Sequence, residues 1–99
     1  MPNTYRIDVT KLAEESLDQI FNYKFEHSEH SAWDFFDGFF LDIRKLSTLP
    51  HRGFNIYKTL KGRVYKEHTI IYTISENDNI VSIVDIVDPK QDTKASKYY

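Results

Sequence analysis

The spacing of the apolar residues changes near residue 56, and this change restricts the fold more than any other feature. Before it, apolar residues such as Ala13, Leu17 and Ile20 recur every three or four positions, as on one face of a helix. After it, apolar and polar residues alternate and β-branched residues are frequent, as in strands. A chain with both patterns is expected to pack helices against a sheet.

One strand and two helices are predicted before this change. Residues 5–9 alternate between apolar and polar, which is typical of a half-buried strand. Thr10 suits a helix N-cap, because its hydroxyl can accept a hydrogen bond from a free backbone N–H. A polar break at residues 27–30 ends the first helix, and Ser31 is expected to cap a second helix from Ala32 to Leu46. Helices joined by so short a link form an antiparallel hairpin.

Strands are predicted for most of the remaining chain. We expect them at residues 56–60, 63–74 and 80–87, with the first turn at Lys61-Gly62. Pro89 ends the last strand, because proline cannot donate a hydrogen bond to a neighbouring strand. The predicted order is β-α-α-β-β-β. This is an α+β fold in which an antiparallel sheet, a three-stranded meander, packs against the helical hairpin.

The composition excludes several classes of protein. The chain has 99 residues, too few for two independent cores, so one domain spanning residues 1–99 is expected. It has no cysteine, which excludes disulfides, thiol nucleophiles and iron–sulfur clusters. Its apolar runs are too short for a membrane-spanning helix, so no membrane partner is expected. The first residues lack a basic stretch followed by an apolar one, and a cytoplasmic location is therefore expected.

Charge is distributed unevenly along the chain. Residues 1–49 carry five basic and nine acidic side chains, whereas residues 50–99 carry eight basic and six acidic ones. Most of the basic excess falls within residues 51–68, in which Glu67 is the only acidic residue. The basic residues of this segment are Arg52, Lys58, Lys61, Arg63 and Lys66. They indicate contact with an anionic partner such as a phosphate backbone, or else ordinary surface patterning.

The same segment contains residue types that RNA cleavage requires. Attack by the RNA's own 2′-hydroxyl needs a base, an acid for the leaving oxygen and cations around the phosphorus. Because histidine titrates near neutral pH, His68 is a candidate base, as is Glu67. If both lie on one strand they point to opposite faces, so only one of them can share a face with Lys58. The alternative is a solvated, polar end of a strand.

No metal site or cofactor is predicted. His27 and His30 have the spacing of two metal ligands, but no third ligand is evident near them. Asp34 and Asp37 lie one turn apart on the second predicted helix, where a solvated face is expected rather than a catalytic pair of carboxylates.

Three apolar residues of the second predicted helix lie off its core-facing stripe. They are Trp33, Phe40 and Leu41. Together they could form an exposed apolar patch of the kind that marks a partner site. We expect this patch, or an edge of the sheet, to receive a helix or strand of a partner protein. The alternative is that Trp33 and Phe40 only cover the periphery of the core.

Six short patterns of residues, at positions expected in the core and in turns, are distributed from Tyr5 to about Asp92. They are Tyr5-x-Ile7, Ala13-x-x-x-Leu17-x-x-Ile20-x-x-Tyr23, Ala32-x-x-Phe35, Ile43-x-x-Leu46-x-x-x-Pro50-x-x-Gly53, Ile70-Ile71-Tyr72-Thr73-Ile74 and Val81-x-Ile83-x-x-Ile86-Val87. With these patterns and its order of elements, the chain resembles the RelE/ParE superfamily of bacterial type II toxins, which includes plasmid-stabilisation toxins. Because the matching positions are structural, they support the fold more strongly than a mechanism.

The resemblance implies a toxin that a cognate antitoxin neutralises. RelE-like members cut mRNA in the ribosomal A site without a metal, using basic and aromatic residues on the sheet. ParE-like members poison DNA gyrase and lack that nuclease cluster. We favour ribosome-dependent mRNA cleavage, because the basic segment can contact backbone phosphates. The alternatives are a non-enzymatic gyrase poison and a non-toxic relative that retains only antitoxin binding.

The functional positions of the nuclease branch match this sequence unevenly. Lys58 and Lys61 fit the lysines that follow the Pro-Gly loop, whereas Thr69 stands where an arginine is usual. Lys90 is nearest to a second usual arginine, and the C-terminal aromatic could only be Tyr98 or Tyr99. Lysine offers one point charge where arginine grips phosphate with a fork, and threonine offers none.

If the chain is such a nuclease, each candidate residue has an expected role. Lys58, Lys61 and Arg63 would bind and stabilise the phosphate. His68 would act in proton transfer, with Lys90 assisting. On charge alone, Arg52 and Lys66 would add contacts to the RNA backbone.

Overall fold

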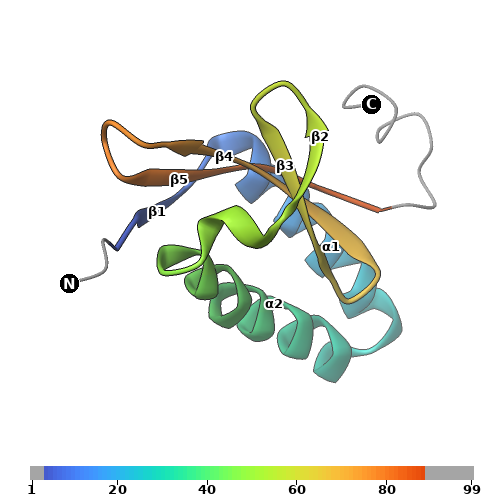
Figure 1. Cartoon of the computed structure of the whole chain (residues 1–99). Helices are drawn as coiled ribbons and strands as arrows, with labels where there is room; N and C mark the ends of the chain where they lie inside the picture. Colours follow the sequence, from blue (N-terminus) through green and yellow to red (C-terminus); the bar gives the residue numbers. More distant parts are fainter. Residues whose placement is uncertain (1–3, 89–99) are drawn as a thin grey trace.

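The computed structural model describes residues 4–88, which form two α-helices, two short 3-10 helices and five strands. In chain order these are β1 (Arg6–Val9), α1 (Lys11–His27), α2 (Glu29–Arg44), η1 (Lys45–Ser47), η2 (Pro50–Arg52), β2 (Phe54–Tyr57), β3 (Leu60–Tyr65), β4 (His68–Ser75) and β5 (Ile80–Val87). The strands form one sheet in the order β1-β5-β4-β3-β2. Both α-helices lie on the same side of this sheet (Figure 1). The predicted α+β class is confirmed.

The sheet is mixed rather than purely antiparallel. Strands β2, β3, β4 and β5 pair antiparallel in sequence order, so the meander has four strands where three were predicted. Strand β1 then pairs parallel with β5, with Ile7 opposite Val81. A parallel pair needs a long crossover connection, and here the two helices and the meander supply it.

Two of the predicted strand limits are wrong. The strand expected at residues 63–74 is two strands, β3 and β4, joined by a turn at Lys66 and Glu67, whose φ angles are 44° and 69°. Residues other than glycine rarely adopt positive φ angles. The turn contains none of the glycine or asparagine residues that usually signal a tight turn. The first turn lies at Lys58 and Thr59 rather than at Lys61-Gly62, with Lys58 at a φ of 51°. Gly62 lies inside β3, where a side chain would overlap the ring of Phe54.

The link between the helices is shorter than predicted. Thr10 caps α1 as expected, and its hydroxyl accepts a hydrogen bond from the backbone N–H of Ala13. Helix α2 begins at Glu29, and its N-cap is Ser28 rather than Ser31. The backbone N–H of Ser28 bonds to the carbonyl of Lys24, while its hydroxyl accepts from the N–H of Ser31. One serine therefore ends α1 and starts α2.

The main core lies between the helices and the sheet. Its buried residues are Ala13, Leu17, Phe35, Phe39, Ile43, Leu46, Tyr65, Ile70, Tyr72, Val81, Ile83 and Ile86. A second, smaller cluster of Ile71 and Val87 lies under Ile56 and Leu60. Within residues 4–88, neither helix is long and apolar enough to cross a membrane.

Candidate functional site

The candidate basic residues are divided between the two ends of β3. Lys58 lies in the turn before β3, and Lys61 lies near the start of the strand. Lys66 and His68 lie at the other end, where Tyr65 pairs with His68. The strand has six residues, so the two ends are about 16 Å apart at a rise of about 3.3 Å per residue. We call them the open end and the covered end, because only the second lies against α2.

At the covered end, Arg63 is held by Asp42 of α2. Its Nε donates to one carboxylate oxygen at 2.7 Å, and a terminal nitrogen donates to the other at 3.1 Å. Both side chains are mostly buried, with 23% and 14% of their surface exposed. The hydrogen bond to Asp42 is the main cause that raises the pKa of Arg63. This bidentate pair joins β3 to α2, and it engages the guanidinium that would otherwise be available to bind a phosphate.

Lys66 forms a second ion pair with α2. Its ammonium group contacts the carboxylate of Asp34 at the surface. The hydrogen bond from Lys66 lowers the pKa of Asp34, and the same bond raises the pKa of Lys66. The two cations at this end are therefore neutralised by α2.

His68 is packed beneath the same helix. Only 10% of its side chain is exposed, and its ring contacts Phe35 edge to face at 5.0 Å between centroids. Its Nδ1 lies 2.9 Å from the carbonyl oxygen of Lys66, so Nδ1 carries a hydrogen. Its Nε2 lies 4.0 Å from Asp88. The structure does not bring His68 together with Lys58 and Lys61.

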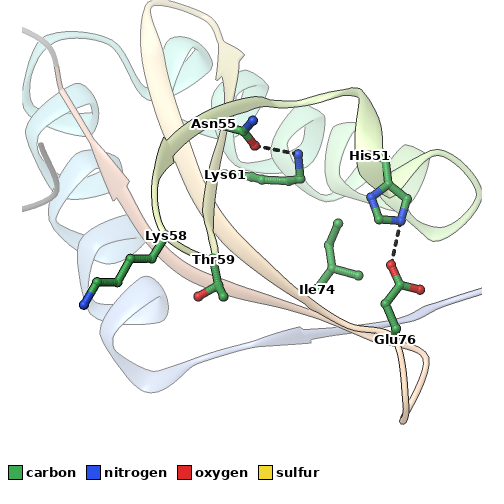
Figure 2. A pocket seen from close by; sticks show the side chains of 7 residues that line it. All are labelled: His51, Asn55, Lys58, Thr59, Lys61, Ile74 and Glu76. Carbon is green, nitrogen blue, oxygen red and sulfur yellow. Dashed lines mark hydrogen bonds and ion pairs between the residues drawn. The ribbon is translucent and has the colours of Figure 1, made fainter.

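At the open end, a depression of about 170 Å³ lies between the β2–β3 hairpin and the β4–β5 turn (Figure 2). It is lined by His51, Asn55, Lys58, Thr59, Lys61, Ile74 and Glu76. Two of the predicted residues, Lys58 and Lys61, therefore share a site, but with a different histidine from the predicted one.

Glu76 joins three separate segments at the edge of this depression. One of its carboxylate oxygens lies 2.7 Å from Nε2 of His51, and the other accepts from the hydroxyl of Tyr5 at 2.6 Å. The hydrogen bond to Glu76 is the main cause that raises the pKa of Tyr5. Because a carboxylate only accepts, Nε2 of His51 carries a hydrogen, and in the neutral ring Nδ1 has the lone pair. Figure 2 shows Nδ1 turned toward the side of the depression where Lys61 lies.

The cations of the open end differ in how firmly they are held. Lys61 donates to the side-chain oxygen of Asn55 at 2.9 Å. Lys58 points away from the depression, with its ammonium 5.2 Å from the ring centre of Tyr57 (Figure 2). Arg52 is exposed on η2. These cations have no carboxylate partner among residues 4–88.

The predicted apolar patch is part of a larger aromatic cluster on the helices. Trp33 packs edge to face on Phe21 of α1 at 4.9 Å, and Phe36 lies between Trp33 and Phe40. Phe25 extends the cluster along α1. We call these five residues the aromatic ladder. Leu41, exposed over 62% of its surface, lies outside its ring contacts.

Comparison with known proteins identifies the family. Residues 7–93 match the family described as the ParE toxin of the type II toxin–antitoxin system, parDE. The chain belongs to this family. The toxin also resembles a chain of the RelBE2 toxin–antitoxin complex from Mycobacterium tuberculosis, with a TM-score of 0.59 over 86% of this chain and 98% of that chain. At 16% sequence identity, this likeness shows the fold. No curated protein matches the toxin significantly.

The predicted membership of the RelE/ParE superfamily is thus confirmed. Thr69 lies in β4 between Val64 and Val87 and brings no charge. Lys90, Tyr98 and Tyr99 lie outside the described residues. In the described part of the toxin, no group of three or more potential ligands could hold a metal ion.

Proposed function

We propose that this toxin stops growth by cleaving ribosome-bound mRNA at the open end of β3. The observation that supports the proposal is the placement of His51, which Glu76 orients at 2.7 Å and which lies beside Lys61 in one depression. A histidine oriented by a carboxylate and next to a fixed cation is an arrangement suited to general base catalysis.

The proposed reaction uses the hydroxyl of the RNA itself. Nδ1 of His51 takes the proton of a 2′-hydroxyl, and O2′ forms a bond to the adjacent phosphorus. The bond from phosphorus to the 5′ oxygen of the next nucleotide then breaks. Lys61 stabilises the negative charge on the phosphate oxygens, and water protonates the leaving 5′ oxygen, because the depression is open to solvent. The products are a 2′,3′-cyclic phosphate and a 5′-hydroxyl.

The other candidate residues take different roles in this proposal. Lys58 and Arg52 are exposed cations near the depression that contact backbone phosphates. Arg63 and Lys66 hold the sheet to α2 through Asp42 and Asp34. His68 supports the covered end, and Lys90 remains a predicted phosphate contact. A cytoplasmic location follows, because ribosomes are the proposed site of action.

One observation favours a second function, the poisoning of DNA gyrase by binding alone. Among the described residues, no arginine lines the depression. Arg63 is paired with Asp42, and the uncharged Thr69 stands where an arginine is usual in the nuclease branch. A lysine contributes a single point charge, which favours the nuclease transition state less than an arginine fork does. The match to the ParE toxin family is consistent with this second function.

Inducible expression, with and without the neighbouring gene, tests both functions. On the proposal, the toxin arrests growth, reverse transcription detects cuts in ribosome-bound mRNA, and gyrase supercoiling is unaffected. Arrest with intact mRNA and inhibited gyrase would instead establish the second function. Absence of any growth effect would contradict both and leave a non-toxic relative.

A pair of lysine variants locates the activity. Lys61→Met should lower mRNA cleavage at least about tenfold, because it removes the charge that stabilises the phosphate. Lys45→Met is the matched control, because Lys45 is an exposed lysine outside the depression, near Asp42. Equal activity in the two variants would place the reaction elsewhere on the toxin.

A further inference from the structure

The backbone on both sides of His51 is held by one buried hydroxyl group. Tyr72 of β4 is buried, and its hydroxyl donates to the carbonyl oxygen of Pro50 at 2.7 Å. The same hydroxyl oxygen accepts from the backbone N–H of Gly53 at 3.1 Å. A methyl group at Gly53 would overlap this hydroxyl, so the two residues are in close contact. His51 lies on η2 between the two points at which Tyr72 attaches the chain.

The imidazole ring of His51 is held separately, by Glu76. One carboxylate oxygen of Glu76 lies 2.7 Å from Nε2 of His51 (Figure 2). The other oxygen accepts from the hydroxyl of Tyr5 at 2.6 Å. Because each oxygen has a partner, a rotation of the carboxylate would break both contacts. Tyr5 therefore restricts the group that orients the histidine.

Tyr5 is suited to this role, because its own position is fixed. Its backbone N–H donates to the carbonyl of Ser47 at 2.8 Å, and its carbonyl accepts from the hydroxyl of Ser47 at 2.9 Å. Its side chain packs against the main core. The backbone N–H of the next residue, Arg6, donates to the carbonyl of Asn79 in the β4–β5 turn at 2.8 Å. The start of the chain thus holds both the carboxylate of Glu76 and the turn that carries it.

These contacts matter because His51 lies at the surface, with 60% of its side chain exposed. An exposed side chain ordinarily samples several rotamers, and holding it in one of them costs conformational entropy. A general base must lie within hydrogen-bond reach of the proton that it takes, so a small displacement lowers the rate. Neither Tyr72 nor Tyr5 lines the depression, and their effect on a reaction there would be exerted through His51.

We propose that Tyr72 and Tyr5 are positioning residues, and that each restricts the movement of His51. Tyr72 fixes the backbone of η2, whereas Tyr5 fixes the imidazole ring through Glu76. The inference rests on the proposed function in one respect, because it takes His51 to be the base in RNA cleavage. The placement of the ring does not depend on RNA, and it can be measured in the free toxin.

Three phenylalanine variants, each without one hydroxyl group, test the proposal. Tyr72→Phe should lower mRNA cleavage per folded molecule about tenfold, and Tyr5→Phe about threefold. Tyr65→Phe is the matched control, because the hydroxyl of Tyr65 also bonds to a buried backbone oxygen, that of Phe35, but at the covered end. It should lower the unfolding midpoint and leave cleavage within about twofold of the wild type. An equal loss of cleavage in all three variants would mean that only stability matters, and it would overturn the proposal.

The position of the hydrogen on His51 is a measurement that a merely structural role would not change. Nitrogen NMR of the free toxin at about pH 9, where a histidine ring is ordinarily neutral, shows which ring nitrogen carries the hydrogen. Tyr5 keeps its hydroxyl hydrogen at this pH, because the hydrogen bond to Glu76 raises its pKa. The wild type and Tyr65→Phe should carry the ring hydrogen on Nε2. Tyr5→Phe and Tyr72→Phe should show a larger share of the Nδ1–H form, because each loosens the bond to Glu76. The same spectrum in all four proteins would contradict the proposal.

A double variant tests the route from Tyr5 to His51. Glu76→Ala removes the carboxylate, so adding Tyr5→Phe to it should cause no further loss of cleavage. A further threefold loss in that background would show that Tyr5 acts by another route, and it would contradict its proposed role. Failure of the proposed function would give a different result. If even the wild type left mRNA intact while the ring hydrogen moved as expected, RNA cleavage would be excluded and the positioning of His51 by the two tyrosines would be supported.

Discussion

The two ends of β3 carry similar residue types in different surroundings. The covered end has His68 near Asp88, with Lys66 in the adjoining turn. The open end has His51 paired with Glu76, and Lys61 beside them. The side chain of His68 is 10% exposed and that of His51 is 60% exposed. A histidine, a carboxylate and a lysine therefore occur twice, but only one set is accessible to a macromolecule.

Helix α2 is the cause of this difference. Its carboxylates Asp34 and Asp42 bind the cations of the covered end, and its Phe35 covers the ring of His68. The open end lies beyond the helix, and within residues 4–88 the only carboxylate that lines its depression is that of Glu76. A basic residue on this sheet is therefore available to a ligand only where the acidic helix does not face it.

Separate replacement of His51 and His68 should give the largest difference between the two ends of β3. His51→Ala should lower mRNA cleavage by about 10²–10⁴-fold, the usual contribution of a general base. Added imidazole should restore part of the activity, because the depression is open. His68→Gln should instead lower the unfolding midpoint and leave cleavage per folded molecule within about threefold.

The opposite pattern of activity in these two variants would contradict the assignment of the open end as the reactive one. If His68→Gln removed cleavage from a toxin that remained folded, while His51→Ala retained it, the covered end would be the reactive one. Circular dichroism of both variants distinguishes loss of fold from loss of activity.

The fold followed from the sequence to a large extent, for reasons seen in particular residues. Periodicity located both helices, because Leu17 and Phe39 repeat with their neighbours on a single buried face. It failed at Lys66 and Glu67, whose left-handed backbone is imposed by the pairing of β3 with β4 rather than by residue type. It also could not show that β1 joins β5, because partner choice between distant strands is a tertiary property.

A close packing of Tyr65 against Gly38 holds the covered end to α2. The hydroxyl of Tyr65 donates to the carbonyl oxygen of Phe35 at 2.9 Å, and a methyl group at Gly38 would overlap that hydroxyl. Gly38→Ala should therefore destabilise the toxin by about 1–3 kcal/mol, although alanine favours a helix by about 1 kcal/mol over glycine.

A second substitution should reverse the sign of this effect. In Tyr65→Phe the obstructing hydroxyl is absent, and Gly38→Ala in that background should stabilise the toxin by about 0.5–1 kcal/mol. Urea unfolding of the four proteins measures the coupling. A destabilisation that is the same in both backgrounds would contradict the contact.

The pairing of Arg63 with Asp42 gives the next largest effect. Arg63→Met should cost about 1–3 kcal/mol of unfolding free energy, because Asp42 is only 14% exposed and would lose both hydrogen bonds. Arg63→Lys should recover only part of the loss, since lysine cannot form the fork. In a double-mutant cycle with Asp42→Asn, additive losses would mean that the two residues act independently.

The candidate site could be predicted only in part. Lys58 and Lys61 were accessible to sequence reasoning because they lie close together in a basic segment. His51 and Glu76 were not, because they are 25 positions apart and meet only when η2 folds against the β4–β5 turn. Arg63 looked equivalent to Lys61 until α2 supplied Asp42, a contact between residues 21 positions apart.

The smallest expected effect is a pH dependence at the covered end. Lys66 lowers the pKa of Asp34 in the folded toxin, so their contact stabilises the fold above the unfolded pKa of this carboxyl and is lost as pH falls through the lower, folded value. The raised pKa of Lys66 has the opposite consequence, with stability lost as pH rises through the folded value. Both side chains are largely exposed, so salt should screen the effect.

Thermal unfolding against pH should show Asp34→Asn slightly less stable than the wild type at neutral pH and equal to it in strong acid. Asp37→Asn removes the same charge from the same helix without breaking an ion pair within residues 4–88, and its pH profile should follow the wild type. If the two asparagine variants gave the same profile, α2 would act on the covered end through its total charge, and the contact between Lys66 and Asp34 would not distinguish that end of β3.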